Sequence, residues 1–150
     1  MRKRFIFTLI LLLIFSYTSI NGYEYQKERD TIEYLLNERI KIMNEFLYGY
    51  KDMMDLKTKL KRIERDNLLE NDLSILYKVI DCPTDYELAM SVKVHKVNDI
   101  EITGDEIIVN ADLNWYMSGY DGEFNLIRNY EIKCIEKNKE MYLTQLKILN

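Results

Sequence analysis

Proline, glycine, cysteine and histidine are scarce in this chain. Its 150 residues include one proline, five glycines, two cysteines and one histidine. Long disordered linkers are therefore not expected. The single histidine, His95, leaves at most one candidate for a histidine-based metal site or a serine–histidine–aspartate triad, and we interpret it as a surface residue. There is no HExxH, glycine-rich phosphate loop or CxxC, and the acidic run 99–106 lacks the spacing of a calcium loop. The sequence predicts no metal site, no cofactor and no set of catalytic residues.

Residues 1–22 have the layout of a signal peptide. Basic residues at positions 2–4 precede an almost unbroken apolar run over 5–17 and a small or polar end. That run is shorter than the roughly 20 residues that usually span a bilayer, which favours cleavage before Tyr23 over an uncleaved N-terminal anchor. The rest of the chain is exported in either case, because the positive end stays inside. We expect a secreted or extracytoplasmic protein with one domain over 23–150.

The charge balance differs between the leader and the domain. The whole chain has 21 lysines and arginines against 25 aspartates and glutamates. Without the three basic residues of the leader, 18 remain against the same 25, which gives residues 23–150 a net charge of −7. Phosphate backbones and anionic lipid surfaces repel an acidic domain, so neither nucleic acid nor a membrane surface is expected as a partner. A basic run, Lys57, Lys59, Lys61 and Arg62, is interpreted as a solvated face.

Export makes a disulfide between the two cysteines, Cys82 and Cys134, chemically possible. Such a bridge would close a long loop and stabilise the fold by about 4 kcal/mol on a chain-entropy model. The alternative is two free buried thiols, because Cys134 lies on the inward side of an expected strand. The sequence leaves both alternatives open.

Apolar residues at spacings of three and four predict that the first half of the domain is helical. The pattern covers 24–48 as one long amphipathic helix that ends at Gly49. A second helix is expected over 51–56, whereas 57–64 fit either its continuation or a short edge strand. A third helix is expected over about 68–80 and is stopped by the single proline.

Beyond that proline the period changes to two residues, which is the pattern of strands. Residues 107–117 show it best, with apolar side chains at odd positions and mostly polar ones at even positions. An antiparallel sheet with one packed and one wet face is expected. Its strands form a meander over about 86–102, 107–117, 123–136 and 141–149, with a bulge near Lys96. Helices followed by such strands make an α+β domain.

This order of elements resembles the cone-shaped NTF2-like and cystatin-like α+β domains. The resemblance covers residues 26–149, and the closing segment MYLTQLKIL is similar to the last strand of that class. It implies a long helix and short helices packed on a curved four-stranded antiparallel meander. The chain is also similar to small exported bacterial domains, some of which stand behind a membrane anchor in conjugation and secretion machinery. The class hosts isomerases, dehydratases, scaffolds and interaction modules, so the fold alone assigns no function.

Arg128 is the clearest departure from strand alternation. The alternation places this charged residue on the inward face, where a guanidinium must be paired or reach solvent. A regular hairpin would set it near Leu113. One interpretation is a concave pocket that binds an anionic group through Arg128. The other lining residues of that pocket would be Trp115, Tyr130 and Phe124. The interpretation that we prefer is that Arg128 stacks on Trp115 or pairs with a carboxylate of the long helix.

An isomerase-type pocket would also need an inward acid as its base, and Asp112 and Glu131 fall on the outward side of the central strands. This argues against an enzyme. We expect an exported non-enzymatic domain that binds a protein or a second copy of itself through the open sheet face. Tyr116 and Tyr120, near a turn, are expected to be exposed contact residues. The alternatives are a small-ligand pocket protein or enzyme of the NTF2-like type, and a membrane-anchored component of a secretion or conjugation assembly.

Overall fold

The computed structural model describes residues 25–49, 52–81 and 87–149. The expected signal peptide and Cys82 lie outside these ranges. By its internal contacts the chain divides into two units, Met1–Asp30 and Thr31–Asn150. Of the first unit the structure describes residues 25–30, which include the start of one helix, and the remaining described residues belong to the second unit.

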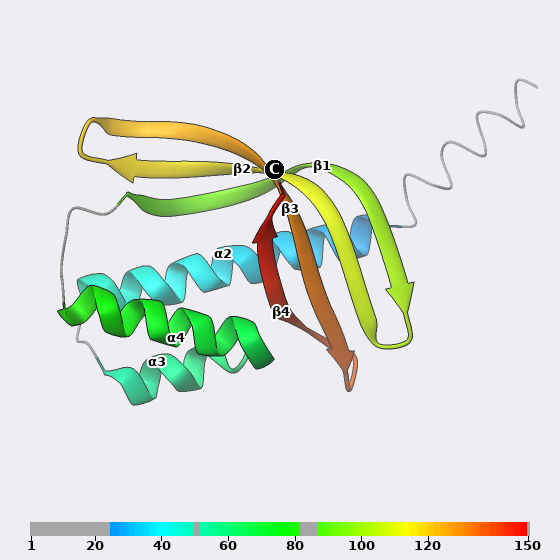
Figure 1. The fold of residues 1–150 in the computed structure, drawn as a ribbon, viewed down its shortest axis with the longest axis horizontal. Coiled ribbons are helices and arrows are strands. Elements are labelled where there is room, and N and C mark those ends of the chain that lie inside the picture. The colour runs from blue at the N-terminus through cyan, green and yellow to red at the C-terminus, as the bar shows by residue number, and fades with distance from the viewer. Residues whose placement is uncertain (1–24, 50–51, 82–86, 150) are drawn as a thin grey trace, which may run out of the picture. The chain divides into compact units, whose positions relative to one another are not determined.

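The described residues form three helices followed by four strands (Figure 1). The elements are α2 (Gln26–Tyr48), α3 (Met53–Leu60), α4 (Asp66–Asp81), β1 (Leu88–Thr103), β2 (Glu106–Gly119), β3 (Gly122–Lys137) and β4 (Glu140–Ile148). This confirms the α+β prediction. None of the helices described is long and apolar enough to cross a bilayer.

The four strands form one antiparallel sheet in the order β1-β2-β3-β4, which is the predicted meander. Gly104 has a φ of 62° in the turn between β1 and β2, a left-handed conformation that glycine adopts without strain. The register of β1 on β2 shifts between Val94 and Lys96, where the sequence predicts a bulge, and at two further places. Bulges bend a strand and increase its twist, and Figure 1 shows β1, β2 and β3 curving along their length.

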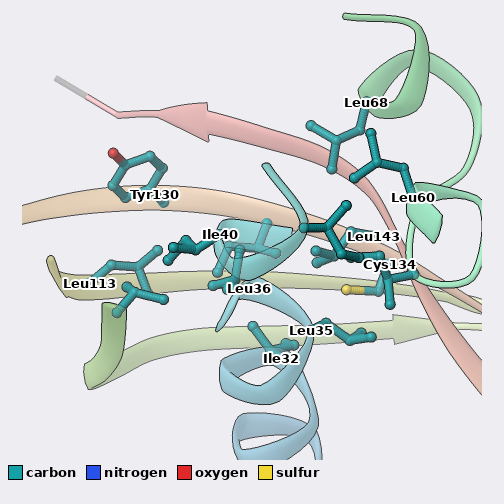
Figure 2. Close-up of a cluster of buried hydrophobic side chains, with 14 of the residues drawn as sticks. Ile32, Leu35, Leu36, Ile40, Leu60, Leu68, Leu113, Tyr130, Cys134 and Leu143 are labelled. Carbon is teal, nitrogen blue, oxygen red and sulfur yellow. The ribbon is translucent and has the colours of Figure 1, made fainter. Parts of the chain in front are cut away.

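A packed core lies between the helices and one face of the sheet. The odd positions of β2 from Ile107 to Trp115 are buried there, as the alternation predicts. Leu36 of α2 and Leu113 of β2 are both fully buried, and Figure 2 shows them among the side chains that fill this space. Burial of each such leucine stabilises the fold by about 1.5–3 kcal/mol, so the core holds the helices on the sheet.

Polar side chains of α2 cover the free edge of β1. The Asn37 side chain donates to the Val92 carbonyl (2.8 Å) and accepts from the Val92 amide (3.0 Å). Asn44 donates to the Ala89 carbonyl, and Glu33 accepts from the Val94 amide, both at 2.8 Å. These contacts satisfy backbone groups that an open edge would offer to another chain. The long helix therefore uses its polar side, as well as its apolar side, to hold the sheet.

The opposite edge of the sheet is covered by the segment between α3 and α4. The Leu143 amide donates to the Ile63 carbonyl (2.8 Å), and the Arg65 amide donates to the Leu143 carbonyl (2.9 Å). Glu64 thereby forms a parallel bridge with Leu143 of β4. The two interpretations left open for 57–64 each hold in part, since the helix continues to Leu60 and a strand-like contact follows.

Candidate interaction surface

The residues singled out by the sequence share one face of the β2–β3 hairpin. Arg128 lies opposite Leu113, as a regular hairpin predicts. Trp115 and Tyr130 are buried, with ring centroids 5.7 Å apart, whereas Phe124 lies nearer the turn and is 37% exposed. Burial raises the pKa of Tyr130, and the positive charge of Arg128 partly offsets that rise. The hairpin thus brings the aromatic pair together and leaves Phe124 apart.

The Arg128 side chain is exposed. Among the residues described, it forms neither an ion pair with a helix carboxylate nor a stack on Trp115, so the interpretation that we preferred for it is wrong. The space between α2 and the sheet is filled by side chains such as Ile40 and Tyr130 (Figure 2). Binding of a ligand by Arg128, Trp115, Tyr130 and Phe124 stays a prediction.

A cluster of three charged residues, which the sequence reasoning missed, joins α2 to α4 and to the β4 edge; its two carboxylates are buried and its arginine is half-buried. Arg39 donates from Nε and Nη2 to the two carboxylate oxygens of Asp72, at 2.6 and 2.7 Å. Glu64 Oε1 lies 3.1 Å from the same Nε. The one hydrogen of Nε points to Asp72 and so is not donated to Glu64. Neither oxygen of Glu64 has a hydrogen-bond partner among the described residues.

Glu64 is fully buried, and Asp72 is 2% exposed. Burial, reinforced by the nearby charge of Asp72, raises the pKa of Glu64 to about 8, although Arg39 acts in the opposite direction. A protonated Glu64 leaves one negative and one positive charge in the cluster. No hollow described below includes these three side chains, so we interpret the cluster as part of the fold.

The largest described hollow lies on the outside of the domain and measures about 760 Å³. Its walls come from α2, from the end of α3 and the following segment, and from the start of β4. We call it the basic hollow, because five basic and three acidic side chains line it. The charged lining residues are Lys41, Lys59, Lys61, Arg62, Arg65, Glu38, Glu45 and Glu140. The uncharged lining residues are Thr31, Tyr34, Leu35, Ile42, Ile63, Met141 and Tyr142.

Arg65 is the best-fixed charge of the basic hollow. Its guanidinium carbon lies 3.6 Å from the centroid of the Tyr142 ring. Its Nη1 donates to the carbonyl of Glu64 (2.7 Å) and also to that of Lys61. The Tyr142 hydroxyl in turn donates to Glu140 at 2.5 Å, which raises the pKa of Tyr142. A stacked and hydrogen-bonded guanidinium loses little side-chain freedom when it binds an anion.

The positive charges of the basic hollow are only partly neutralised. Lys59 pairs with Asp55 at 2.8 Å and with Glu45 at 3.6 Å. Lys61 and Arg62 are exposed, and neither forms an ion pair in the part of the chain that the structure describes. The basic run noted in the sequence is therefore solvated, as expected, and three of its four residues line a concave surface.

The outer face of the sheet is polar, as the alternation predicts. Asp112 of β2 accepts from Asn98 of β1 (3.2 Å) and from Asn129 of β3 (2.8 Å), so one carboxylate links three strands. These two amides, Asn129 first, lower the pKa of Asp112. On the next strand pair Gln145 donates to Glu131 at 3.0 Å. This face satisfies many of its polar groups within the sheet.

The turn between β2 and β3 carries a second charged surface. Glu87, Asp121 and Glu123 line a smaller hollow there, and Tyr120 beside them is 94% exposed. The prediction that Tyr120 is exposed is confirmed. Tyr116 is half-buried instead, so the prediction for it is wrong. Its hydroxyl donates to Glu123, and this bond raises the pKa of Tyr116. We call Glu87, Tyr120, Asp121 and Glu123 the acidic tip.

No group of three or more potential metal-binding side chains is found among the described residues. His95 is exposed. Cys134 is a free, buried thiol whose pKa burial raises to about 12. Cys82, with which a disulfide would be chemically possible, lies outside the described residues.

Comparisons with solved structures show what the fold is similar to. The intermembrane space region of the chloroplast protein ARC6 matches with a TM-score of 0.50 and 11% identity, over 81% of this chain and 95% of that one. A designed NTF2 protein matches at 0.45 and 12%, over 81% and 99%. The Kfla4162 protein from Kribbella flavida matches at 0.43 and 13%, over 74% and 86%. No protein-family model and no curated protein matches the sequence.

The chain has the α+β layout that the resemblance to NTF2-like and cystatin-like domains implies. Three helices followed by an open, curved, four-stranded antiparallel sheet are the arrangement predicted from the order of elements, and that prediction is confirmed. At 11% identity the likeness to the ARC6 region shows the fold alone, so function must be argued from the surfaces of this chain.

Proposed function

We propose that this protein is an exported, non-enzymatic interaction domain that binds the acidic surface of a protein through the basic hollow. The observation that carries the proposal is the contrast between two spaces. The space beneath the sheet, where an NTF2-like domain would hold a small ligand, is packed with side chains at Ile40, Leu113 and Tyr130. The outside of the domain carries a large hollow with uncompensated positive charge.

The charge of the basic hollow is unusual for this chain. Residues 23–150 have a net charge of −7, yet Lys61, Arg62 and Arg65 converge here without an ion-pair partner among the described residues. A positive patch on an acidic protein raises the rate of encounter with an acidic patch and disfavours basic partners. The hollow therefore supplies specificity for an acidic protein surface.

The lining of the basic hollow favours a protein partner over a small apolar ligand. Small-molecule sites are enclosed and mostly apolar, with few polar groups. Here eight lining side chains are charged, and the aromatic ring of Tyr142 is covered by Arg65. Arginine and tyrosine are enriched at protein interfaces, where a stacked guanidinium can bind a carboxylate in a defined geometry.

The proposal is tested by the size of the native complex in cells that produce the full chain. We expect Lys61→Glu with Arg62→Glu to release the protein from its complex, because two attractive charges become repulsive. Lys93→Glu with Lys96→Glu is the matched control, since both lysines are exposed on β1, away from the hollow. Release by the control pair alone would instead assign the interface to the open sheet face.

Export and anchoring are tested on the same preparation. We expect the protein outside the cytoplasm, with a mature N-terminus at Tyr23 when the leader is cleaved. A mass that retains residues 1–22 would show the anchored alternative, in which the domain belongs to a membrane assembly. A fully cytoplasmic protein would contradict the proposal.

A further inference from the structure

We propose that the acidic partner is a second copy of this chain, whose acidic tip enters the basic hollow. This inference rests on the proposed function and names its partner. The acidic tip lies at the β2–β3 turn beside Glu87, the residue before β1, and the basic hollow lies against the start of β4. The two surfaces carry opposite charges, so copies of one chain can bind head to tail.

The acidic tip carries negative charge, which is complementary to the net positive charge of the basic hollow. Glu87, Asp121 and Glu123 gather around the tip, and none of the described lysines or arginines lines it. None of the three carboxylates forms an ion pair among the residues that the structure describes. One oxygen of Glu123 accepts from Tyr116, which leaves the other carboxylates of the tip available to a partner.

Tyr120 supplies an anchor at the centre of the acidic tip. It is 94% exposed, the largest exposure among the exposed large hydrophobic side chains of the described chain. A tyrosine can bury its ring and still hydrogen-bond through its hydroxyl, and such residues dominate the binding energy of many interfaces. A hollow of about 760 Å³ has room for this side chain and for the carboxylates beside it.

One copy cannot join its own tip to its own hollow. The tip lies at the Gly119 end of β2, whereas Glu106, at the other end, pairs with Ile135 of β3. The neighbouring Glu136 pairs with Met141, which lines the hollow. The tip and the β4 wall of the hollow therefore lie toward opposite ends of β2, whose contour length is roughly 40 Å at about 3.3 Å per residue. Complementary surfaces at two ends of a molecule favour association between molecules.

Pairing of two different surfaces makes a heterologous interface, which yields a ring when the rotation closes and an open chain when it does not. Each copy in such an assembly uses its tip on one side and its hollow on the other. The attraction depends on exposed charges, so salt should weaken it. We expect high salt to raise the apparent dissociation constant by about tenfold or more.

The test is sedimentation velocity of the purified full chain over a concentration series at low and high salt. The wild-type protein should form salt-sensitive oligomers. Two variants should each remain monomeric, one with Asp121→Lys and Glu123→Lys, the other with Lys61→Glu and Arg62→Glu. An equimolar mixture of the two should associate again, because the intact hollow of the first can receive the intact tip of the second.

Each other outcome overturns the inference. A wild-type chain that stays monomeric at every concentration would show that the partner is not a second copy. In that case, a native complex in cells that is lost on reversal of Lys61 and Arg62 would leave the proposed function standing. Oligomers that survive the reversal of Asp121 and Glu123, or a mixture that does not regain association, would show that copies meet through other surfaces. Matched circular dichroism spectra and melting temperatures establish that the variants are folded.

Discussion

The cluster of Arg39, Asp72 and Glu64 should make the stability of the fold depend on pH. The Glu64 carboxyl has a pKa of about 8 in the folded protein, against an ordinary value of 4.5. Between these values the folded state keeps a proton that the unfolded chain releases. The stability that this group contributes is complete below the ordinary pKa and is lost as pH rises through the folded pKa.

The size of the effect follows from proton linkage. One unit of pKa difference corresponds to about 1.4 kcal/mol. Between about pH 5.5 and 7.5 the two states differ by nearly one bound proton, so the free energy of unfolding should fall by about 2 kcal/mol. For a domain of this size that is a fall of roughly 5–10 °C in Tm. Glu64→Gln should remove this contribution to the slope, because glutamine has no charge at any pH.

The assay is denaturant unfolding of the full chain across this pH range, followed by circular dichroism. Glu70→Gln is the matched control, because Glu70 is exposed on α4 and its loss should leave the wild-type slope unchanged. The difference between the wild-type and Glu64→Gln curves isolates the buried carboxyl from every other titrating group. A Glu64→Gln protein with the wild-type slope, or a wild-type protein that gains stability over this range, would refute the reasoning.

Three further predictions concern the covered edge of β1, the hydrophobic core and the thiol of Cys134. Asn37→Ala should lower the free energy of unfolding by about 2–3 kcal/mol and remove the hydrogen-exchange protection of the Val92 amide. Unchanged protection would contradict the hydrogen bonds between Asn37 and Val92. Leu36→Ala should lower the free energy of unfolding by about 2–5 kcal/mol. Met54→Ala, at an exposed site, should change the free energy of unfolding by less than about 0.5 kcal/mol. Equal losses from the two substitutions would contradict the placement of Leu36 in the core. Cys134 should resist alkylation in the folded reduced chain and react after unfolding, as mass spectrometry can show; labelling of the folded chain would contradict its burial.

Local periodicity accounts for the parts of the fold that the sequence predicted. The alternation over 107–117 identified the buried side of β2, and its continuation located the other strands and the bulge near Lys96. The spacing of apolar residues likewise located α2 to within two residues at its start. Such patterns report which side of an element is buried, because one period repeats along the element.

Contacts between distant segments could not be predicted in the same way. Asn37 belongs to the polar side of α2 in the sequence, yet its amide completes the edge of β1. Asp72 carried a weak signal, since it stands among the leucines of α4, where an acid must be paired. Its partners Arg39 and Glu64 come from other elements, so the cluster becomes visible only in the folded chain.

The outcome for Arg128 has a geometric reason. Alternation correctly placed it opposite Leu113 on the inward face. The pairing of β3 with β4 begins at Tyr130, so the end of β3 that carries Arg128 extends beyond β4. An inward position there reaches solvent. The basic hollow was equally hidden from sequence reasoning, because its lining comes from three separate segments of the chain.

The most direct test of the proposed function is site-specific photo-crosslinking in cells that produce the full chain. A photoreactive residue at Arg62, inside the basic hollow, is compared with one at Ile75, an exposed position of α4 outside it. We predict an extracytoplasmic adduct from position 62 that is absent from position 75 and is lost when Lys61→Glu is added. A mass of two chains would identify the second copy as the partner, and another mass would identify a different protein. Equal adducts from both positions, or none from position 62, would contradict the assignment of the basic hollow as the binding surface.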